Sequence, residues 1–505
     1  MASSPPKTTA EPPAGGATIF GHPRGLATLF LTEMWERFSY YGMRALLVLY
    51  LVSGGPDAAA GSQGGGLGMS AATATAIFSV YVSMVYLMAM PGGWFGDRVW
   101  GARKTVAVAG TVIMAGHICL ALPGSAMFFV GLALVAIGSG LLKANISTMV
   151  GHLYKEGDVR RDAGFTIFYM GINLGAFAAP FGIGIVGEKV SWHLGFGLAA
   201  VGMALGLAQF LFFSRHLSPH SSLVPNPLTA AERRSVTVRT LAGVLVAVAF
   251  YGIVIAAGVY TLNWALVPII AAGLVIPVAV LVRIRRDGEL SDAEQKKMSA
   301  FIWFFVAAAI FWMIYDQGAS TLSLFGDAHT EKNLFGWEMP TVLYQALNPL
   351  FIMLLAPVFA SLWLALARRD REPTTIVKFS FGLFVVGLSF YVFLIPMGMV
   401  SGDEQVTMWW LVGIYLMHTV AELCLSPVGL SLTTKMAPKK YMSQMMGVFF
   451  LAVTAGDSVT GLLAVAGVDL NGAGVVALEA TAAVAAAGAI YLYRNRVRAL
   501  MGDVH

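Results

Sequence analysis

Residues 33–42 read Glu33-Met34-Trp35-Glu36-Arg37-Phe38-Ser39-Tyr40-Tyr41-Gly42, and they lie inside an otherwise apolar segment. Their charged and tyrosine side chains, continued by Arg44, recur at the spacing of one face of an α-helix. The surrounding segment, residues 24–53, is long enough to cross a bilayer. Because a charge at the bilayer centre costs about 2.5 to 3.5 kcal/mol on insertion scales, we expect this polar face to point into a protein interior or a watery cavity.

The composition is that of a polytopic membrane protein. Of the 505 residues, 57% are hydrophobic and only 12% are charged, and apolar runs of about 20 residues recur along the chain. We therefore predict an all-α fold with fourteen transmembrane helices. The predicted spans are residues 24–53, 70–96, 102–122, 125–151, 162–187, 190–214, 237–258, 262–284, 298–324, 339–366, 374–397, 406–434, 441–467 and 472–493.

Basic residues indicate how these spans are oriented. Most of the 32 Lys and Arg residues fall in the tails and in alternate loops, and only Lys189 and Lys332 fall in the loops of the other side. By the positive-inside rule, both termini are expected in the cytoplasm, with the chain in the inner or plasma membrane. The net charge of +5 follows from this topology and requires no nucleic-acid partner.

A glycine-rich loop follows the second span. It reads Gly92-Gly93-Trp94-Phe95-Gly96-Asp97-Arg98-Val99-Trp100-Gly101-Ala102-Arg103-Lys104. Its glycines allow helices to approach closely, and Asp97 can hold basic residues at the cytoplasmic edge. The loop resembles the loop signature of the major facilitator superfamily, although a short loop of this composition can also be a simple positive-inside turn.

Five further motifs, in this order, resemble those of the proton-dependent oligopeptide transporter (POT) family. They are Glu33-x-x-Glu36-Arg37-Phe38-x-Tyr40-Tyr41-Gly42; Phe168-Tyr169-x-x-Ile172-Asn173-x-Gly175; Phe311-Trp312-x-x-Tyr315-Asp316-Gln317; Gln345-x-x-Asn348-Pro349; and Glu422-x-x-x-Ser426-Pro427-x-Gly429-Leu430. Their joint occurrence is far more specific than any one of them.

The resemblance implies a major facilitator fold, with two six-helix halves around a central site and two extra helices between them. Such a protein works by rocking one half against the other. Residues 1–22 are rich in Pro, Ser, Ala and Gly and contain no apolar h-region, so we expect a disordered cytoplasmic tail and not a signal peptide. The expected division is a tail at 1–22, the first bundle at 23–216, a linker with the two extra helices at 217–296, the second bundle at 297–496 and a cytoplasmic tail at 497–505.

The charges within the spans fit a peptide substrate. A free short peptide carries an ammonium and a carboxylate up to about 10 Å apart, so its site needs opposite charges on facing walls. The first half supplies Arg37 and Lys143, and the second supplies Asp316 and Glu422. By resemblance, the two cations lie toward the peptide carboxylate and Glu422 binds the ammonium.

Each of these charges also has a structural interpretation. Arg37 can form an ion pair with Glu33 or Glu36 in its own helix. Lys143 can extend to the cytoplasmic face. Glu422 can be a protonated acid that is hydrogen-bonded within its bundle.

Amide and aromatic side chains complete the predicted site, although each amide taken singly can equally join two helices. The predicted substrate-binding residues are Arg37, Tyr40, Tyr41, Tyr86, Lys143, Tyr169, Asn173, Gln345, Asn348, Glu422, Ser426 and Phe449. The predicted proton-coupling and gating residues are Glu33, Glu36, Arg37, Lys143, Asp316 and Glu422.

Two positions depart from the family pattern. Phe449 stands where the family commonly has a tryptophan, so the pocket wall there is expected to be roomier and to lack an indole donor. Ser79 replaces the histidine that animal members carry in the second span, so histidine-based proton coupling cannot be assumed.

Two hypotheses follow for energy coupling. We expect Lys143 and Asp316, from opposite halves, to pair across an outer-facing gate that opens when Asp316 is protonated. We also expect Glu33 and Glu36 to hold the Arg37 guanidinium when peptide is absent, and to accept protons when peptide is bound.

The predicted function is import of di- and tripeptides together with protons, by a carrier that works as a monomer. The chain contains no phosphate-binding loop and no motif of a nucleophile or metal enzyme, so neither enzyme activity nor a cofactor is expected. His117, His152 and His193 lack metal-ligand spacing, and Cys119 and Cys424 both fall within apolar spans. A carrier of another small solute with the same fold, or a membrane receptor for peptides, remains open.

Overall fold

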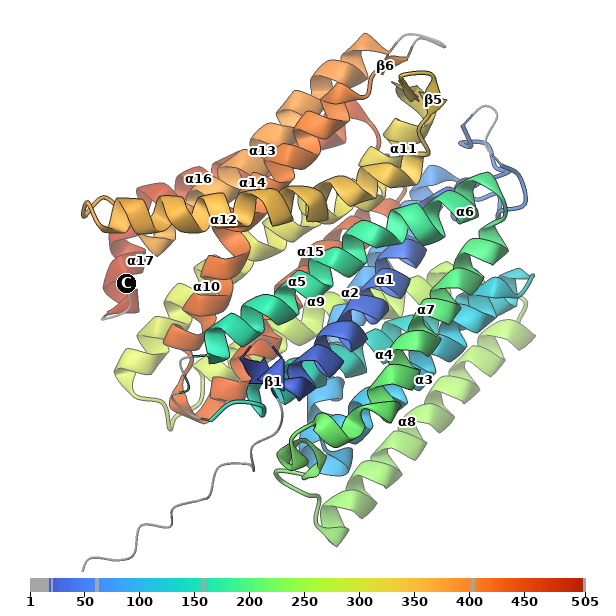
Figure 1. The fold of residues 1–505 in the computed structure, drawn as a ribbon. Coiled ribbons are helices and arrows are strands. Elements are labelled where there is room, and N and C mark those ends of the chain that lie inside the picture. Colours follow the sequence, from blue (N-terminus) through green and yellow to red (C-terminus); the bar gives the residue numbers. More distant parts are fainter. Residues whose placement is uncertain are drawn as a thin grey trace, which may run out of the picture.

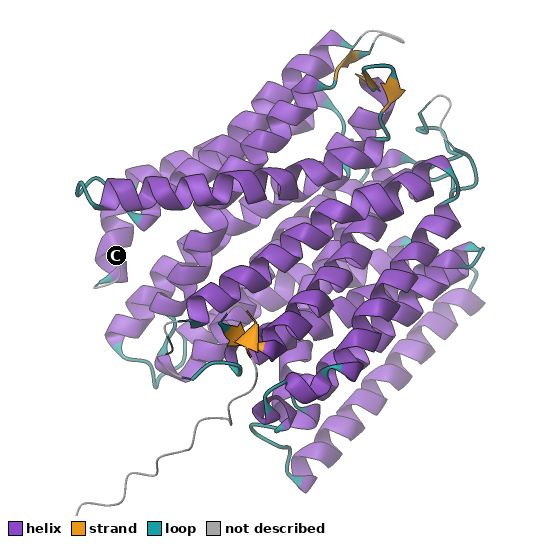
Figure 2. Cartoon of the chain, viewed as in Figure 1, coloured by secondary structure: helices purple, strands orange, loops and turns teal. Residues whose placement is uncertain are grey.

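The computed structural model describes residues 18–19, 21–59, 63–155, 158, 160–400 and 405–502, and these are almost entirely helical (Figure 2). The helices are α1 Arg24–Val52, α2 Ala71–Phe95, α3 Ala102–Ala121, α4 Ser125–Gly151, α5 Arg161–Ala179, α6 Ile185–Lys189, α7 Trp192–Phe212, α8 Ala230–Ala256, α9 Asn263–Arg285, α10 Asp292–Tyr315, α11 Thr321–His329, α12 Leu347–Ala367, α13 Thr375–Met399, α14 Trp409–Met436, α15 Met442–Val465, α16 Ala473–Leu492 and α17 Arg494–Met501.

Short irregular helices and strands connect these elements. The irregular helices are η1 Gly96–Trp100, η2 Pro180–Gly184, η3 Ser214–His216, η4 Pro219–Ser222, η5 Asp316–Ala319, η6 Thr341–Ala346 and η7 Lys439–Tyr441. Strands β1 Thr18–Ile19 and β2 His22–Pro23 pair antiparallel, as do β4 Asn333–Leu334 and β5 Trp337–Glu338, whereas β3 Thr330–Glu331 and β6 Val406–Thr407 pair parallel.

Within the described residues, thirteen helical segments are long and apolar enough to cross a membrane. Helix α1, with 29 residues, also has the required length, but its hydropathy is lowered by Glu33, Glu36, Arg37 and Arg44. Counting α1, the number agrees with the fourteen spans expected from the sequence.

The spans form two bundles that lie side by side (Figure 1). In the N-bundle, α1 packs against α5 and α7, and α3 packs against α4; in the C-bundle, α13 packs against α14 and α16. Helices α2 and α15 pack against each other and join the bundles. Glycines permit the tight crossings: a Cβ added at Gly116 of α3 would lie 2.7 Å from Val135 Cγ2 of α4.

The two extra helices differ in their environment. Helix α9 packs against α2 and α15, where it covers the junction of the bundles. Helix α8 stands at the edge of the molecule (Figure 1), and only 6% of its most apolar window is buried. Its apolar surface is therefore suited to contact with lipid.

The two ends of the molecule can be told apart by the elements that they carry. We call the end with the β1–β2 hairpin and α17 the terminal end, and the opposite end, with α6 and the β4–β5 hairpin, the far end (Figure 1). At the far end the bundles meet through contacts of η6 with η2, α5 and α6, and of α1 with α11.

The structure differs from the expected layout in three places. Residues 18–19 and 21–22, assigned to a disordered tail, take part in the β1–β2 hairpin, and His22 Nδ1 lies 2.9 Å from the Tyr154 hydroxyl; residues 1–17 and 20 lie outside the described residues. The expected tail at 497–505 begins inside α17, whose Val497 and Met501 are buried, and residues 503–505 lie outside the described residues. The span predicted at 298–324 is interrupted between α10 and α11.

Candidate functional site

The polar face of α1 is buried, as the sequence predicts. Glu33, Glu36 and Arg37 are at most 5% exposed. Arg37 Nε lies 2.9 Å from Glu33 Oε1 and 2.7 Å from Glu36 Oε2. Ser139 of α4 donates a hydrogen bond of 3.1 Å to Glu36 Oε1. The prediction that the two acids hold the guanidinium is confirmed.

Arg37 keeps unused hydrogen-bonding capacity. Its Nη2 atom is buried and has no hydrogen-bond partner among the described residues. The guanidinium carbon lies 5.3 Å from the centre of the Tyr40 ring, and that ring stacks on Tyr81 with their centroids 6.1 Å apart. Because a buried donor without a partner is unfavourable, this arrangement is suited to an anionic ligand such as a carboxylate.

Lys143 of α4 lies between two aromatic rings at the junction of the bundles. Its Nζ atom is 3.7 Å from the centre of the Tyr86 ring on α2 and 5.2 Å from that of Phe450 on α15. Arg37 is close enough to repel it electrostatically. Within the described part of the chain, Lys143 forms no ion pair, so its ammonium is supported by ring faces alone.

Asp316 pairs with Arg44 and not with Lys143. Arg44 Nη2 of α1 lies 2.5 Å from Asp316 Oδ1 at the end of α10, and the Arg44 guanidinium carbon is 5.2 Å from the centre of the Phe78 ring. The hypothesis of a Lys143–Asp316 pair is wrong for this conformation. Arg44 lies two turns beyond Arg37 on α1 and therefore beside the break that follows α10. At this position Arg44, and not Lys143, is the cation that contacts Asp316.

Glu422 of α14 accepts two hydrogen bonds through a single oxygen. The Tyr315 hydroxyl donates to Glu422 Oε2 at 2.6 Å, and Asn348 Nδ2 donates to the same atom at 3.0 Å. Asn348 Nδ2 also donates to Thr419 Oγ1 at 3.1 Å. The side chain of Glu422 is therefore held in place from α10 and α12, with no cation paired to it among the described residues.

The break between α10 and α11 leaves backbone carbonyl groups without helical hydrogen bonds. Residue Ser320 has φ −122° and ψ −86°, so the helix cannot continue through it. The carbonyl of Gly318 accepts hydrogen bonds from Gln345 Nε2 at 2.9 Å and from the Tyr415 hydroxyl at 2.5 Å. The Gln345 amide nitrogen therefore bonds a carbonyl group that the break leaves without its helical donor. This is the structural role that the sequence analysis gave as the alternative to ligand binding.

The other predicted amide and tyrosine side chains are also near the charged groups. Asn173 Nδ2 donates back to the Tyr169 carbonyl of its own helix at 3.0 Å. Tyr169 is 45% exposed and within electrostatic reach of Glu422, and Tyr41 is within reach of both Arg37 and Glu422. Tyr41 and Tyr169 therefore lie between the predicted charges of the two bundles.

Two predicted residues on α14 and α15 have different surroundings. Ser426 lies one turn after Glu422, and its buried Oγ has no partner among the described residues. Phe449 is only 4% exposed, and its ring packs against Gly429 and Phe379 inside the C-bundle. In this conformation the Phe449 ring faces the core of the C-bundle, and the next residue, Phe450, faces Tyr86 with ring centroids 6.0 Å apart.

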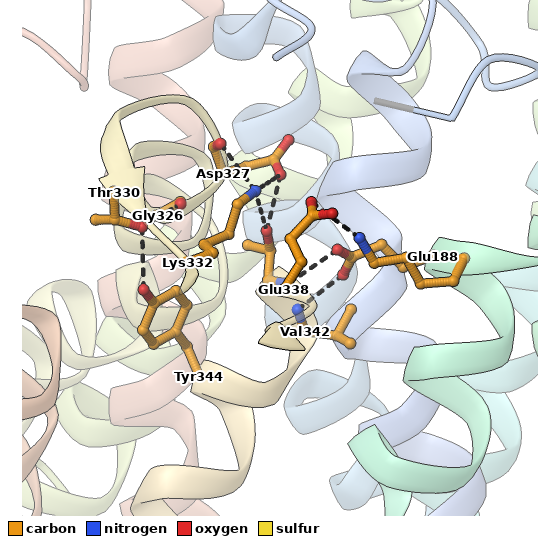
Figure 3. Close-up of polar contacts among 10 residues, drawn as sticks. Glu188, Gly326, Asp327, Thr330, Lys332, Glu338, Val342 and Tyr344 are labelled. Atoms are coloured by element: carbon orange, nitrogen blue, oxygen red, sulfur yellow. Dashed lines mark hydrogen bonds and ion pairs between the residues drawn. The ribbon is translucent and has the colours of Figure 1, made fainter. Parts of the chain in front are cut away.

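At the far end, a network of seven residues joins the bundles (Figure 3). We call Glu188, Lys189, Asp327, Lys332, Glu338, Thr341 and Val342 the far-end network. Glu188 of the N-bundle accepts the backbone N–H groups of Thr341 and Val342, at 2.8 and 2.9 Å, where η6 begins. A carboxylate at a helix N-terminus satisfies donors that the helix itself cannot bond.

Ion pairs surround this contact. Lys189 Nζ lies 3.2 Å from Glu338 Oε1 across the bundles, and Lys332 Nζ lies 3.0 Å from Asp327 Oδ1 within the C-bundle. Lys189, Lys332 and both acids line a cavity of about 280 Å³ together with Glu188. The far end is therefore closed by direct polar contacts.

Several residues that the structure places at or beside the site are absent from the predicted site residues. They are Arg44 and Tyr315, which the polar face and a motif contain but which were given no site role, and Phe450, Asp457 and Glu479. Asp457 is 2% exposed and Glu479 is 3% exposed, and Gln317 Nε2 donates to Glu479 Oε2 at 2.8 Å. Both acids could have been found, because an ionisable residue within an apolar span marks a functional site by default.

Comparison with known proteins identifies the family. A profile described as "POT family" matches residues 103–471. The chain is 43% identical to the transporter YclF of Bacillus subtilis, over 88% of each chain. It is 40% identical to the "Di-/tripeptide transporter" of Lactococcus lactis subsp. cremoris, over 88% of this chain and 89% of that one. A crystal structure of "peptide transporter POT in complex with sulfate" matches with a TM-score of 0.90 and 42% identity, covering 96% of this chain and 97% of the other. The chain therefore belongs to the POT family, and its fold is the major facilitator fold with two six-helix halves and two additional helices.

Proposed function

We propose that the protein is a proton-coupled symporter that imports di- and tripeptides by alternating access. The observation that carries this proposal is the division of charge across the site: Arg37 and Lys143 belong to the N-bundle, and Glu422 belongs to the C-bundle. A zwitterionic peptide that spans the site contacts both bundles at once. Similarity to a relative named as a di-/tripeptide transporter supports the same substrate class.

The peptide carboxylate is assigned to the N-bundle. Arg37 offers a buried Nη2 without a partner, and Lys143 offers an ammonium without an ion pair among the described residues. A carboxylate placed between them gains charge-assisted hydrogen bonds and relieves the repulsion between the two cations. Tyr40, Tyr41 and Tyr86 then surround this end of the peptide.

The peptide ammonium is assigned to the C-bundle. Tyr315 and Asn348 fix one oxygen of Glu422 and leave the other to a ligand. The unpartnered hydroxyl of Ser426 lies one turn away and can accept a second hydrogen bond from the ammonium. Asn173 and Tyr169, on the facing helix α5, are assigned to the peptide backbone.

Proton coupling is assigned to two ion-pair groups. When a peptide carboxylate takes Arg37, Glu33 and Glu36 lose their partner, and a buried acid without a partner binds a proton more readily. The Arg44–Asp316 pair joins α1 to the C-bundle. Protonation of Asp316 removes this contact and favours separation of the bundles at the far end.

The orientation proposed from basic residues gives these contacts a direction. We assign residues 23–216 to one bundle and residues 297–496 to the other. We assign the terminal end of both bundles to the cytoplasmic side of the inner or plasma membrane. The far end then faces outward, and its closed network corresponds to an inward-facing conformation of a carrier that works as a monomer.

Uptake into proteoliposomes tests the proposal. A labelled dipeptide should accumulate under an inward proton gradient, and an uncoupler should abolish the accumulation. Binding without uptake would instead support a membrane receptor. Uptake of another small zwitterion in preference to dipeptides would support a carrier of a different solute.

A further inference from the structure

A second buried carboxyl group lies beside Asp316, and neither the site nor the transport proposed above gives it a role. Asp457 belongs to α15 and is 2% exposed, and Asp316 is 3% exposed. The two carboxyl groups are neighbours that interact electrostatically. Asp316 Oδ2 and Asp457 Oδ2 are both buried, and neither has a hydrogen-bond partner among the described residues.

The backbone of α15 is held at this point from two sides. A Cβ added at Gly456 would lie 2.9 Å from the Met313 backbone nitrogen, so α15 is in direct contact with α10 there. On the other side, Ser458 Oγ lies 2.9 Å from Ser83 Oγ of α2. Asp457 is therefore positioned by packing, and its side chain cannot turn away to water without moving a helix.

The charges that face this pair do not balance two anions. Arg44 of α1 pairs with Asp316, and Lys143 of α4 acts on Asp316 from farther away. Helix α2 contributes the Ser83 hydroxyl, and α9 contributes the backbone of Gly273 beside Ser458. Because Arg44 is paired with Asp316 and Lys143 acts on Asp316 only from farther away, Asp457 has no cation of its own among the described residues, and a single proton between the acids neutralises its charge.

We propose that Asp457 is a proton-binding residue, and that Asp316 and Asp457 act as one proton-sharing pair that controls the Arg44 contact. With one proton on the pair, Asp457 donates a hydrogen bond to ionised Asp316, and Asp316 holds Arg44. A second proton forms an O–H bond on Asp316, neutralises the pair and releases Arg44. The step moves protons only, with no change of oxidation state, and it rests on the proton-coupled transport proposed above.

Infrared spectroscopy of the purified protein, without peptide, tests the shared proton directly. The wild type should show carbonyl bands of protonated carboxylic acids at neutral pH, and Asp457→Asn should remove one of them. Asp316→Asn should shift that Asp457 band, because the partner acid changes, whereas Glu479→Gln should leave it in place. A carbonyl spectrum that Asp457→Asn does not change, or an Asp457 band that does not respond to Asp316→Asn, overturns the proposal.

Transport measurements supply the second readout. Asp457→Asn should lower proton-driven accumulation of a dipeptide by about tenfold, a loss of the size usual for coupling between two sites. Peptide-for-peptide exchange should stay close to wild type, and Asp457→Glu should restore driven uptake in part. Equal loss of both modes means a structural role and overturns the proposal. An Asp457 infrared band that responds to Na⁺ and not to pH also overturns it, because the pair would then bind a sodium ion in place of a proton. If the wild type carries no peptide at all, the proposed function fails while the infrared result still decides the proton pair.

Discussion

At the scale of single residues, the charged side chains of the site use part of their hydrogen-bonding capacity within the protein and leave the rest available to a ligand. Arg37 is held by two acids, yet its buried Nη2 has no hydrogen-bond partner in the part of the chain that the structure describes. Glu422 is held through its Oε2 oxygen, which accepts from Tyr315 and Asn348. Because removal of one partner from a buried charge pair is far more costly than removal of a surface pair, ligands that satisfy both open positions should be strongly preferred.

Blocking the peptide ammonium tests the role of Glu422. An N-acetylated dipeptide should compete at least about a hundredfold more weakly than a free dipeptide, because about 3 to 5 kcal/mol is lost when a buried charge is left without its partner. Glu422→Gln should weaken free dipeptides much more than acetylated ones. Competition against labelled dipeptide uptake measures both effects. Similar potency of the two ligands on the wild type would show that Glu422 is not the ammonium site.

Neutralising the acids beside Arg37 tests proton coupling from that side. Glu33→Gln and Glu36→Gln remove proton acceptors but keep side-chain shape, so each should depress proton-driven uptake more than peptide-for-peptide exchange. Parallel assays of the two modes on the same proteoliposomes give the ratio. Ser139→Ala, which removes a hydrogen bond to Glu36 but no charge, is the matched control and should change both modes alike. Equal losses for the glutamine variants would point to lost binding or folding.

At the scale of helices, hydropathy predicted most elements correctly because a membrane span has a strong and simple signal. The ends of α2, α3 and α4 fall within two residues of the predicted spans. The break after α10 was not predictable in the same way. It depends on Gln345 and Tyr415, distant in sequence, which bond the freed carbonyl of Gly318.

Site residues show the same limit. Motifs placed Arg37 and Glu422 near one centre, since the motifs encode residue types at fixed helix positions, and the resemblance added Lys143. They did not reveal that Arg44 takes Asp316, because that choice depends on how α1 is set against the end of α10. Phe449 faces the core of the C-bundle and Phe450 faces Tyr86. Which of the two faces the site depends on the rotation of α15 about its axis, and the sequence of one apolar span does not determine that rotation.

The start of η6 provides a prediction about one helix end. Glu188→Gln removes the charge that faces the N–H groups of Thr341 and Val342, and loss of such a cap costs about 0.5 to 2 kcal/mol. Hydrogen exchange at these two amides should therefore become faster. Glu338→Gln removes an exposed ion pair, worth about 0 to 1 kcal/mol, and should leave the amides protected. Unchanged exchange in Glu188→Gln would contradict the capping role.

The loop between α9 and α10 provides a prediction about pH. Asp287 accepts hydrogen bonds from Lys440 Nζ at 2.7 Å and from the Tyr441 hydroxyl at 2.6 Å, and these bonds lower the pKa of Asp287 below its usual value. Because the pKa of Asp287 is lower in the folded state, its ionised carboxylate stabilises the loop contact at pH values above the unfolded pKa of about 4. This stabilisation is lost progressively as the pH falls below that value. Proteolysis near Lys440 should accelerate below about pH 4. In Asp287→Asn, cleavage should be fast at neutral pH also, with no added acid step.

At the scale of the whole molecule, the two bundles are joined by contacts of two kinds. Helices α2 and α15 pack over their length and are fixed by the Ser83–Ser458 hydrogen bond, whereas the far-end network is made of polar contacts at one end. Packed apolar surface does not separate and re-form as readily as a few ion pairs and capped N–H groups. The expected motion is therefore a rocking about the α2–α15 contact that breaks the far-end network.

A reversible cross-link tests this motion. Lys189 and Glu338 face each other across the bundles, with Nζ and Oε1 3.2 Å apart at the ends of two long side chains. In Lys189→Cys with Glu338→Cys, a bis-methanethiosulfonate reagent long enough to replace those side chains should bridge the two thiols and keep the far end closed. The reagent should stop dipeptide uptake into proteoliposomes, and a reductant should restore it, because each cycle requires that end to open. Peptide binding to the detergent-solubilised, cross-linked protein should persist, since the site itself is not altered. The matched control is Asp327→Cys with Lys332→Cys, whose native side chains both belong to the C-bundle, with Nζ and Oδ1 3.0 Å apart; its cross-linking should leave uptake unchanged. Full transport by the cross-linked Lys189→Cys, Glu338→Cys variant, with the bridge verified by mass spectrometry, would exclude opening at the far end as a step of the cycle.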